Sequence, residues 1–209
     1  MTEQTPRERR YQRTQQAILD AARQLIHEKG VEGLSMRAIA EIIDYSPAGL
    51  YEYYGSKEEI VGALCGQGFQ RFAQALGRVD VALPAGEYLV ELGIAYINFA
   101  LQNADFFLLM FTTAPVLLPD FFSADKPDPA QSLQSDDSFS ILLRGVDRCV
   151  REGIFPLRPG YGVIEMAHAS WSLVHGIAML QLSLLQRLPF NADQIRITLR
   201  LHHAGLSST

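Results

Sequence analysis

The chain has 209 residues, of which 48% are hydrophobic and 20% are charged, and its formal net charge is −5. This length suits one large domain or two small ones, and the composition is typical of a globular protein rather than a disordered chain. An acidic chain is not a general polyanion-coating protein, although local basic patches remain possible. The two cysteines, Cys65 and Cys149, are too few for a disulfide framework and indicate a reducing compartment.

The N-terminal segment lacks the apolar core of a secretory signal. Polar residues also interrupt every apolar stretch before it reaches the run of about 20 residues that a membrane-spanning helix needs. The interruptions are Glu91, Asn98, Asp105, His175 and Gln181. We therefore expect a cytoplasmic protein with no membrane partner.

Helical periodicity and capping residues predict four helices in the first 78 residues. After a polar tail that reaches Arg13, residues 18–26 repeat apolar side chains every three or four positions, and Gly30 ends this first helix. Ser35 caps a second, short helix. Ser46-Pro47 begins a third helix that ends by about residue 55, and residues 56–59 fit a capping box that opens the fourth.

The rest of the chain is also helical in pattern. We expect helices at about 86–102, 105–113, 139–152, 161–187 and 192–203, separated most clearly by the proline- and aspartate-rich segment 119–138. No alternating strand pattern bounded by hairpin turns is present. The predicted fold class is all-α, with an N-terminal three-helix domain at 11–71 and a C-terminal helical bundle at 72–209.

Residues 35–57 contain the most informative pattern. Two short helices joined by a tight turn, after a longer supporting helix, form a helix-turn-helix, which inserts its second short helix into the major groove of DNA. Asp44 in the turn tolerates a left-handed backbone. Leu50 and Tyr54 are four residues apart and are expected to face the interior. The outward side then carries Pro47, Ala48, Tyr51 and Glu52.

The charges and small residues around this motif suit a duplex. Ala48 and Gly49 allow a close approach to base edges, although Gly49 costs the helix about 1 kcal/mol relative to alanine. Tyrosine and lysine side chains can donate to phosphate oxygens, which positions the protein without specifying a sequence. The candidate donors are Tyr45, Tyr51, Tyr53 and Lys57, and the arginines of residues 7–13 add positive charge nearby.

The stretches ILDAARQLIHEKGVEGLSMRAIAE and YSPAGLYEYYGSKEEI resemble the TetR family of bacterial transcriptional regulators over roughly residues 14–65. The resemblance implies a DNA-binding regulator, most often a repressor. It places these residues at DNA-contact positions or near the backbone: Ser35, Arg37, Ser46, Pro47, Ala48, Gly49, Tyr51, Tyr53 and Lys57. The departures are Asp44-Tyr45, where Gly-Val is common, Tyr54, where Phe is common, and the acidic Glu52 on the reading helix. Together they leave the prediction of DNA binding intact but make the operator sequence unpredictable.

The C-terminal half is similar to one TetR subgroup through AYINFALQNADFFLLMF and WSLVHGIAML, although Ala104 stands where that subgroup often has proline. The resemblance implies a site for a small apolar or aromatic effector. Such sites combine apolar walls with a few polar groups. The candidate lining residues are Tyr96, Phe99, Phe107, Met110, Phe111, His168, Trp171 and His175. A solid core made of the same side chains is the alternative.

The expected helix at 161–187 is apolar on more than one side, so both of its faces need covering. Neighbouring helices of the same chain can cover one face, and a second subunit is the natural cover for the other. We expect a homodimer through this helix and the last helix, with a self-contained core as the alternative. A dimer places two reading helices about 34–36 Å apart, which suits a pseudo-palindromic operator in double-stranded DNA.

The sequence gives little support to catalysis. It has no P-loop, no GxGxxG after a strand, no HExxH and no GxSxG, so we expect no enzyme and no cofactor. His168 and His175 lack a third partner at useful spacing, so no metal site is expected. Two alternatives to a ligand-responsive regulator stay open. One is an all-α small-molecule-binding protein or enzyme that retains the helix-turn-helix only as a scaffold, and the other is a protein-interaction module.

Overall fold

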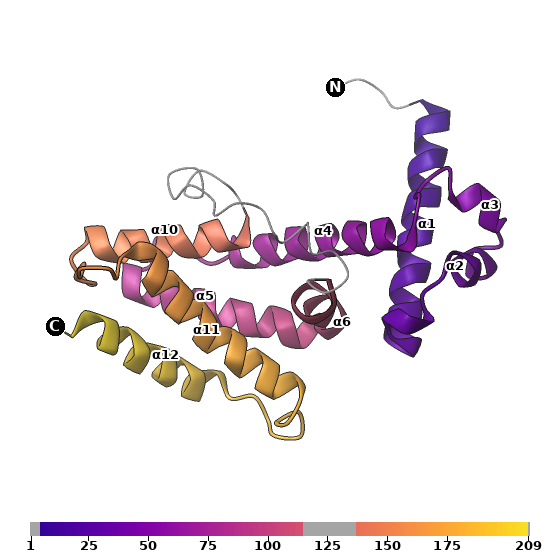
Figure 1. Cartoon of the computed structure of the whole chain (residues 1–209). Helices are drawn as coiled ribbons and strands as arrows, with labels where there is room; N and C mark the ends of the chain where they lie inside the picture. The colour runs from indigo at the N-terminus through magenta and orange to yellow at the C-terminus, as the bar shows by residue number, and fades with distance from the viewer. Residues whose placement is uncertain (1–4, 115–136, 209) are drawn as a thin grey trace. The chain divides into compact units, whose positions relative to one another are not determined.

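The computed structural model describes residues 5–114 and 137–208, and this part of the chain is helical without any β-strand (Figure 1), which confirms the predicted all-α class. The elements are α1 (Pro6–Lys29), η1 (Val31–Gly33), α2 (Met36–Ile42), α3 (Pro47–Leu50), α4 (Lys57–Leu76), α5 (Ala85–Gln102), α6 (Ala104–Leu108), the π-helical turn η2 (Leu109–Thr113), α10 (Ser138–Arg151), α11 (Val163–Leu182) and α12 (Ala192–Ser207).

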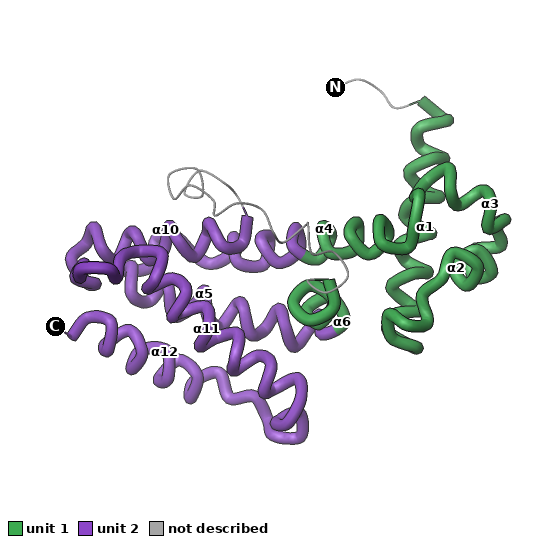
Figure 2. Tube along the Cα trace, in the orientation of Figure 1, with its two compact units in different colours: residues 1–68, 105–123 green, residues 69–104, 124–209 purple. Residues whose placement is uncertain are grey.

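The described residues form two compact units (Figure 2). The first comprises 5–68 and 105–114, and the second comprises 69–104 and 137–208. The boundary between 68 and 69 falls within α4, as does the expected domain boundary between 71 and 72. Residues 105–114 join the N-terminal helices because their side chains pack there. A Cβ at Gly68 would lie 2.5 Å from Met110 Sδ and 3.2 Å from Phe106 Cδ1.

α1 begins at Pro6, so the prediction that a polar tail extends to Arg13 is wrong. The reason is a local capping box. Thr5 Oγ1 accepts a hydrogen bond from the Glu8 N–H at 3.2 Å, and the Glu8 carboxylate accepts one from the Thr5 N–H at 2.7 Å. Proline at the first helical position supplies the φ angle that the helix needs. The helix ends at Gly30, whose φ of 70° confirms the predicted stop.

The helix-turn-helix forms as its capping residues predict. Ser35 Oγ accepts a hydrogen bond from the Ala38 N–H at 3.1 Å and starts α2, and Ser46 Oγ accepts one from the Gly49 N–H at 3.0 Å and starts α3. Asp44, in the turn between them, has φ 53° and so adopts the expected left-handed backbone. α3 is a single turn that ends at Leu50, whose side chain is fully buried.

A capping box also opens α4, with one change from the expected pattern. Ser56 Oγ accepts a hydrogen bond from the Glu59 N–H at 3.2 Å, as predicted. The Glu59 carboxylate accepts its hydrogen bond from the Gly55 N–H, at 2.8 Å, one residue before the cap. The bond to Ser56 satisfies one of the N–H groups that the helix start leaves unpaired, and the bond from Gly55 fixes the residue before the cap.

In the second unit α5 contacts α10, α11 and α12 and is buried along most of its length. Two glycines permit the close packing. A Cβ at Gly93 would lie 2.7 Å from Leu199 Cδ1 of α12 and 3.1 Å from Val174 Cγ1 of α11. A Cβ at Gly145 of α10 would lie 2.8 Å from Leu89 Cδ2 of α5. α5 is therefore the centre of this unit.

The helix ends of the second unit differ in part from those expected. α11 ends at Leu182 instead of about residue 187, and α12 continues to Ser207 instead of ending at His203. Arg158 supports this longer helix, because its guanidinium donates to the carbonyl oxygen of Leu206 at 3.0 Å and to that of Ser208. Most of the predicted loop 119–138 lies outside the described residues, and Asp137 at its end caps α10.

Cys65 and Cys149 are both buried and free, and burial raises the pKa of each thiol to about 11. Within residues 5–114 and 137–208, no single helix is long and apolar enough to cross a membrane. α5 and the helical segment 104–113 reach that length and composition only when taken together as a bent pair, and α5 is mostly buried.

Candidate nucleic-acid interface and effector cavity

The outward face of the helix-turn-helix lies where the sequence predicts it. Pro47, Ala48 and Tyr51 are exposed, and 57% of Tyr51 is accessible to solvent, whereas Leu50 on the opposite face of α3 is buried. Glu52 follows the end of α3 and is also exposed. The remaining predicted DNA-contact residues are exposed or half-buried on the same unit: Ser35, Arg37, Tyr45, Ser46, Gly49, Tyr53 and Lys57.

Three tyrosines are joined beside this face. Tyr11 of α1 stacks on Tyr53 with ring centroids 4.7 Å apart, and its hydroxyl donates to the backbone oxygen of Glu52 at 3.4 Å. The Tyr45 and Tyr53 hydroxyl oxygens lie 3.5 Å apart. This hydrogen bond raises the pKa of Tyr45, so its hydroxyl stays protonated and able to donate. Sequence reasoning missed Tyr11, although it lies seven residues before the buried Ile18 and so on the same helix face.

Gly49 has a structural role beyond leaving room for DNA. A Cβ at this position would lie 2.7 Å from Tyr45 Cε1 and 3.0 Å from Ser46 Oγ. The Tyr45 ring therefore fills the space that a side chain would need. This contact offsets the helix-propensity cost of glycine, and it orders one of the candidate phosphate donors.

In the second unit Tyr96 of α5 connects two residues of the Trp-xxx-His-Gly segment. Trp171 Nε1 donates to the Tyr96 hydroxyl at 3.1 Å, and that hydroxyl lies 2.8 Å from His175 Nδ1. The Tyr96 hydroxyl donates to His175 Nδ1 when the neutral ring carries its hydrogen on Nε2, and it accepts from Nδ1 in the other tautomer. Burial lowers the pKa of His175, which favours the neutral ring.

Five of the eight predicted effector residues lie in the second unit. Ring contacts extend from Phe99 through Phe72 to Tyr96, with centroids 4.9 and 5.0 Å apart. His168 is exposed and stacks on Phe139 at 5.4 Å. The other three, Phe107, Met110 and Phe111, belong to the first unit, where the Phe107 and Phe111 rings lie 4.8 Å apart.

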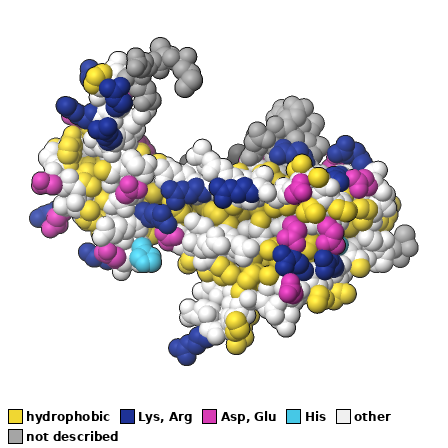
Figure 3. Space-filling model, turned by 180° about the vertical axis from the view of Figure 1, so that it is seen from behind, with side chains coloured by type: hydrophobic (Ala, Val, Ile, Leu, Met, Phe, Trp, Pro, Cys, Tyr) yellow, Lys and Arg dark blue, Asp and Glu magenta, His cyan; other side chains and the backbone are white. Residues whose placement is uncertain are grey.

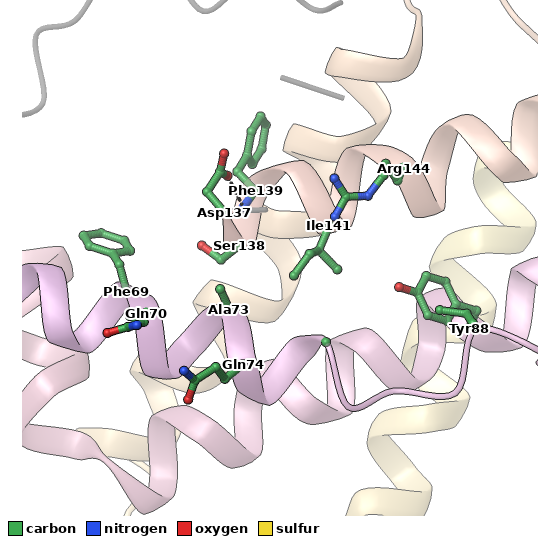
Figure 4. A pocket seen from close by; sticks show the side chains of 12 residues that line it. Phe69, Gln70, Ala73, Gln74, Tyr88, Asp137, Ser138, Phe139, Ile141 and Arg144 are labelled. Carbon is green, nitrogen blue, oxygen red and sulfur yellow. Dashed lines mark hydrogen bonds between the residues drawn. The ribbon is translucent and has the colours of Figure 1, made fainter. Parts of the chain in front are cut away.

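The second unit also contains a cavity of about 770 Å³ between α4, α10 and the start of α5 (Figure 4). Its volume is in the range of small-molecule sites, about 300–1,000 Å³. The wall combines apolar, amide and charged side chains: Phe69, Gln70, Ala73, Gln74, Gly77, Val81, Tyr88, Asp137, Ser138, Phe139, Ile141 and Arg144. None of the eight predicted effector residues lines it. The Phe139 ring nevertheless lies 6.2 Å from that of Trp171, in an edge-on arrangement.

A sequence signal for this cavity exists on α4. Gln70, Ala73, Gln74 and Gly77 repeat at helical spacing and form one face that is less apolar than a core face. Burial raises the pKa of Tyr88, while the nearby charges of Arg144 and Arg148 oppose that rise. Among the described residues, no group of three or more His, Cys, Asp or Glu side chains is arranged to hold a metal ion.

Comparison with known proteins connects these features to one family. Residues 18–64 match the model of bacterial regulatory proteins of the tetR family, and residues 89–196 match the model of the Tetracyclin repressor-like C-terminal domain. An uncharacterized HTH-type transcriptional regulator, YobS, of Bacillus subtilis (strain 168) is 24% identical over 94 residues, which are 45% of this chain and 49% of that protein. The match thus spans about half the length of this relative.

Solved structures share the fold over nearly the whole chain. A protein with unknown function from Rhodococcus sp. RHA1 superposes with a TM-score of 0.71 at 21% identity, covering 93% of this chain and 95% of the other. The TetR family transcriptional regulator PfmR from Thermus thermophilus gives a TM-score of 0.61 at 22% identity, covering 98% and 96%. With its exposed helix-turn-helix and its helical C-terminal unit, this chain belongs to the TetR family of DNA-binding transcriptional regulators.

Proposed function

We propose that this regulator is a ligand-responsive repressor that binds a pseudo-palindromic operator as a homodimer and is released by a small hydrophobic or aromatic effector. The observation that carries the proposal is the exposed face of α3, where Pro47, Ala48 and Tyr51 are open to solvent above the buried Leu50. In this proposal residues 11–71 bind DNA in the cytoplasm, and residues 72–209 bind the effector and dimerise without catalysing a reaction.

The residues of the first unit divide into two kinds of DNA contact. Pro47, Ala48 and Gly49 approach the base edges, where their small size leaves room for the groove wall. Tyrosine hydroxyls and positive charges bind phosphates. The proposed phosphate-side residues are Ser35, Arg37, Tyr45, Ser46, Tyr51, Tyr53 and Lys57, and the hydrogen bond between Tyr45 and Tyr53 supports this role by ordering both rings.

Exposed apolar side chains support a homodimer through α11, α12 and the turn between them. Leu184, with 82% of its surface accessible, is the most exposed of these residues. A surface of this composition is more typical of a subunit interface than of a monomer. The residues concerned are Leu180, Leu184, Leu185, Leu188, Ile197 and Leu201.

The cavity on α4 supports effector binding. Its wall has apolar rings such as Phe69 and Phe139, with amides from Gln70 and Gln74 to orient a polar group. α4 contributes residues to both compact units. An effector that binds one arrangement of α4 more tightly than another would shift the population of DNA-binding dimers. The size of that shift is set by the difference between the two affinities.

The proposal is tested by selecting duplexes from random DNA with the purified protein and then measuring binding to the selected site at a stated salt concentration. The variant Tyr51→Phe/Lys57→Ala should lose binding while its circular dichroism is unchanged. A matched control, Tyr161→Phe/Arg151→Ala, removes the same kinds of group from the second unit, away from the proposed dimer interface, and should bind normally. Unchanged binding in the first variant would contradict the assigned contacts.

The cavity also favours a second candidate, a small-molecule-binding protein that retains the helix-turn-helix only as a scaffold. In that case the random selection would enrich no duplex, although the protein would still bind apolar or aromatic compounds in a thermal-shift screen. Enrichment of a two-fold symmetric site would exclude it.

A further inference from the structure

The first turns of α1 carry a concentration of positive charge that the family match does not include. The match begins at residue 18, whereas α1 begins at Pro6. Residues 7–13 contain four arginines and one glutamate. Figure 3 shows Lys and Arg side chains gathered over these turns. Cations in the first turn of a helix oppose its dipole, so helix stability does not explain their placement.

This part of α1 is fixed to the DNA-reading part of the first unit. Tyr11 stacks on Tyr53 at 4.7 Å and donates to the Glu52 backbone oxygen at 3.4 Å, across 41 residues of sequence. The capping box of Thr5 and Glu8 keeps the preceding turn helical. Side chains presented by these turns are therefore held at a set position relative to α3, which lowers the entropy cost of binding.

Helix geometry separates the arginines into two pairs. Arg7 lies four residues before Tyr11 and so on nearly the same face, and Arg10 flanks that face one turn away from Arg7. Arg9 and Arg13 are each two residues from Tyr11, about 200° around the helix. All four arginines are exposed. The first pair therefore lies nearer to Tyr11 around the helix, at about 40° and 100°, than the second pair, at about 160°.

We infer that Arg7 and Arg10 bind phosphates of the duplex that flank the stretch read by α3. This inference rests on the proposed function. DNA phosphates are the expected partner because they are negatively charged and because the two arginines lie next to the helix-turn-helix surface. Arg7 lies about 6 Å beyond Tyr11 along the helix axis, so its side chain extends outward from the surface that Tyr11 and Tyr53 form. The contact lengthens the site on each side without adding sequence specificity.

The test compares two double variants that remove the same charge at different distances around α1 from Tyr11, Arg7→Ala/Arg10→Ala and Arg9→Ala/Arg13→Ala. Binding of each to the duplex selected by the wild type, and to a scrambled duplex, is measured by fluorescence anisotropy from 50 to 300 mM salt. For the first variant we expect a loss of roughly 30-fold at 0.15 M on both duplexes, and a log–log salt slope about 1.8 shallower. Hydroxyl-radical footprints should also shorten at their outer edges.

The control variant should keep the wild-type footprint and lose less than half as much slope. Equal losses in both variants would mean that general charge, and not a defined contact, is responsible, and would overturn the inference. An unchanged first variant would overturn it as well. If the wild-type protein selects no duplex, both the proposed function and the inference are wrong. If it selects a duplex and the first variant binds like the wild type, only the inference is wrong.

Discussion

Asp105 of α6 accepts a hydrogen bond from Arg23 Nε of α1 at 2.6 Å, which joins residues 82 positions apart within the first unit. The Arg23 guanidinium also lies over the Phe106 ring, 4.3 Å from its centroid. Burial by itself raises the pKa of Asp105, but hydrogen bonds from Arg23 and from the Phe106 N–H outweigh it and hold the pKa below its ordinary value. This ion pair attaches α6 to α1.

The variant Asp105→Asn should lower the free energy of unfolding of the first unit by about 1–2 kcal/mol, because it removes a charge-assisted bond in a half-buried setting. Urea unfolding followed by circular dichroism, with hydrogen exchange of residues 5–68 and 105–114, measures the effect. Glu152→Gln is the control, since the Arg148–Glu152 pair is more exposed and should cost less than about 0.5 kcal/mol. If Asp105→Asn and Glu152→Gln lower the free energy of unfolding equally, Asp105 has no special role in stability.

The variant Gly49→Ala should reduce DNA affinity while leaving stability nearly unchanged. A Cβ 2.7 Å from Tyr45 Cε1 displaces the Tyr45 ring, but alanine returns about 1 kcal/mol of helix propensity. Fluorescence anisotropy with the selected duplex measures the DNA affinity, and thermal unfolding measures the stability. If Tyr45→Ala alone binds DNA as well as the wild type, ring displacement is not the cause.

The variant Tyr96→Phe should destabilise the second unit by about 1–3 kcal/mol. It removes the hydroxyl that accepts from Trp171 Nε1 and lies 2.8 Å from His175 Nδ1, which leaves two half-buried groups without this partner. Trp171 is the only tryptophan of the chain, so its fluorescence reports the change directly. Tyr161→Phe serves as the comparison and should have little effect.

Stability should fall as the pH falls below about 6.5, in part through His203. Its side chain is 8% exposed, and burial, helped by the neighbouring His202, lowers its pKa to about 4. Between these pH values the unfolded chain binds a proton that the folded chain excludes, so acid favours unfolding by about 2 kcal/mol at pH 5. The variant His203→Gln should lose correspondingly less stability between pH 7 and pH 5 in urea titrations. An identical pH dependence would show that other groups are responsible.

Filling the cavity should block small-molecule binding. Ala73 lines it from α4, so Ala73→Trp should reduce binding of the aromatic dye 8-anilinonaphthalene-1-sulfonate at least tenfold, measured by dye fluorescence. Ala75→Trp places the same ring about 200° around the helix and is the matched control. Equal dye binding by the wild type and both variants would locate the dye elsewhere.

Some features of this protein follow from its sequence because they depend on residues three or four positions apart. Ser35, Ser46 and Ser56 each cap a helix by accepting a backbone N–H within one turn. The positive φ values of Asp44 and Gly30 depend on these residues themselves, because Asp has a short polar side chain and Gly has no Cβ. The Thr5–Glu8 capping box also depends on residues three positions apart, and so it can be predicted from the sequence. Residues 7–13 are mostly charged and lack apolar periodicity, which is why a helix was not predicted there.

Other features were decided only by tertiary structure, because they join segments far apart along the chain. The contact of Tyr11 with Tyr53 spans 42 residues, and the bond of Arg23 with Asp105 spans 82. Hydrophobic periodicity predicts which face of a helix is buried, but it does not predict which other segment packs against that face. The cavity is a further case. It is the space left where α4, α5 and α10 meet, and that space depends on how side chains from three helices pack together.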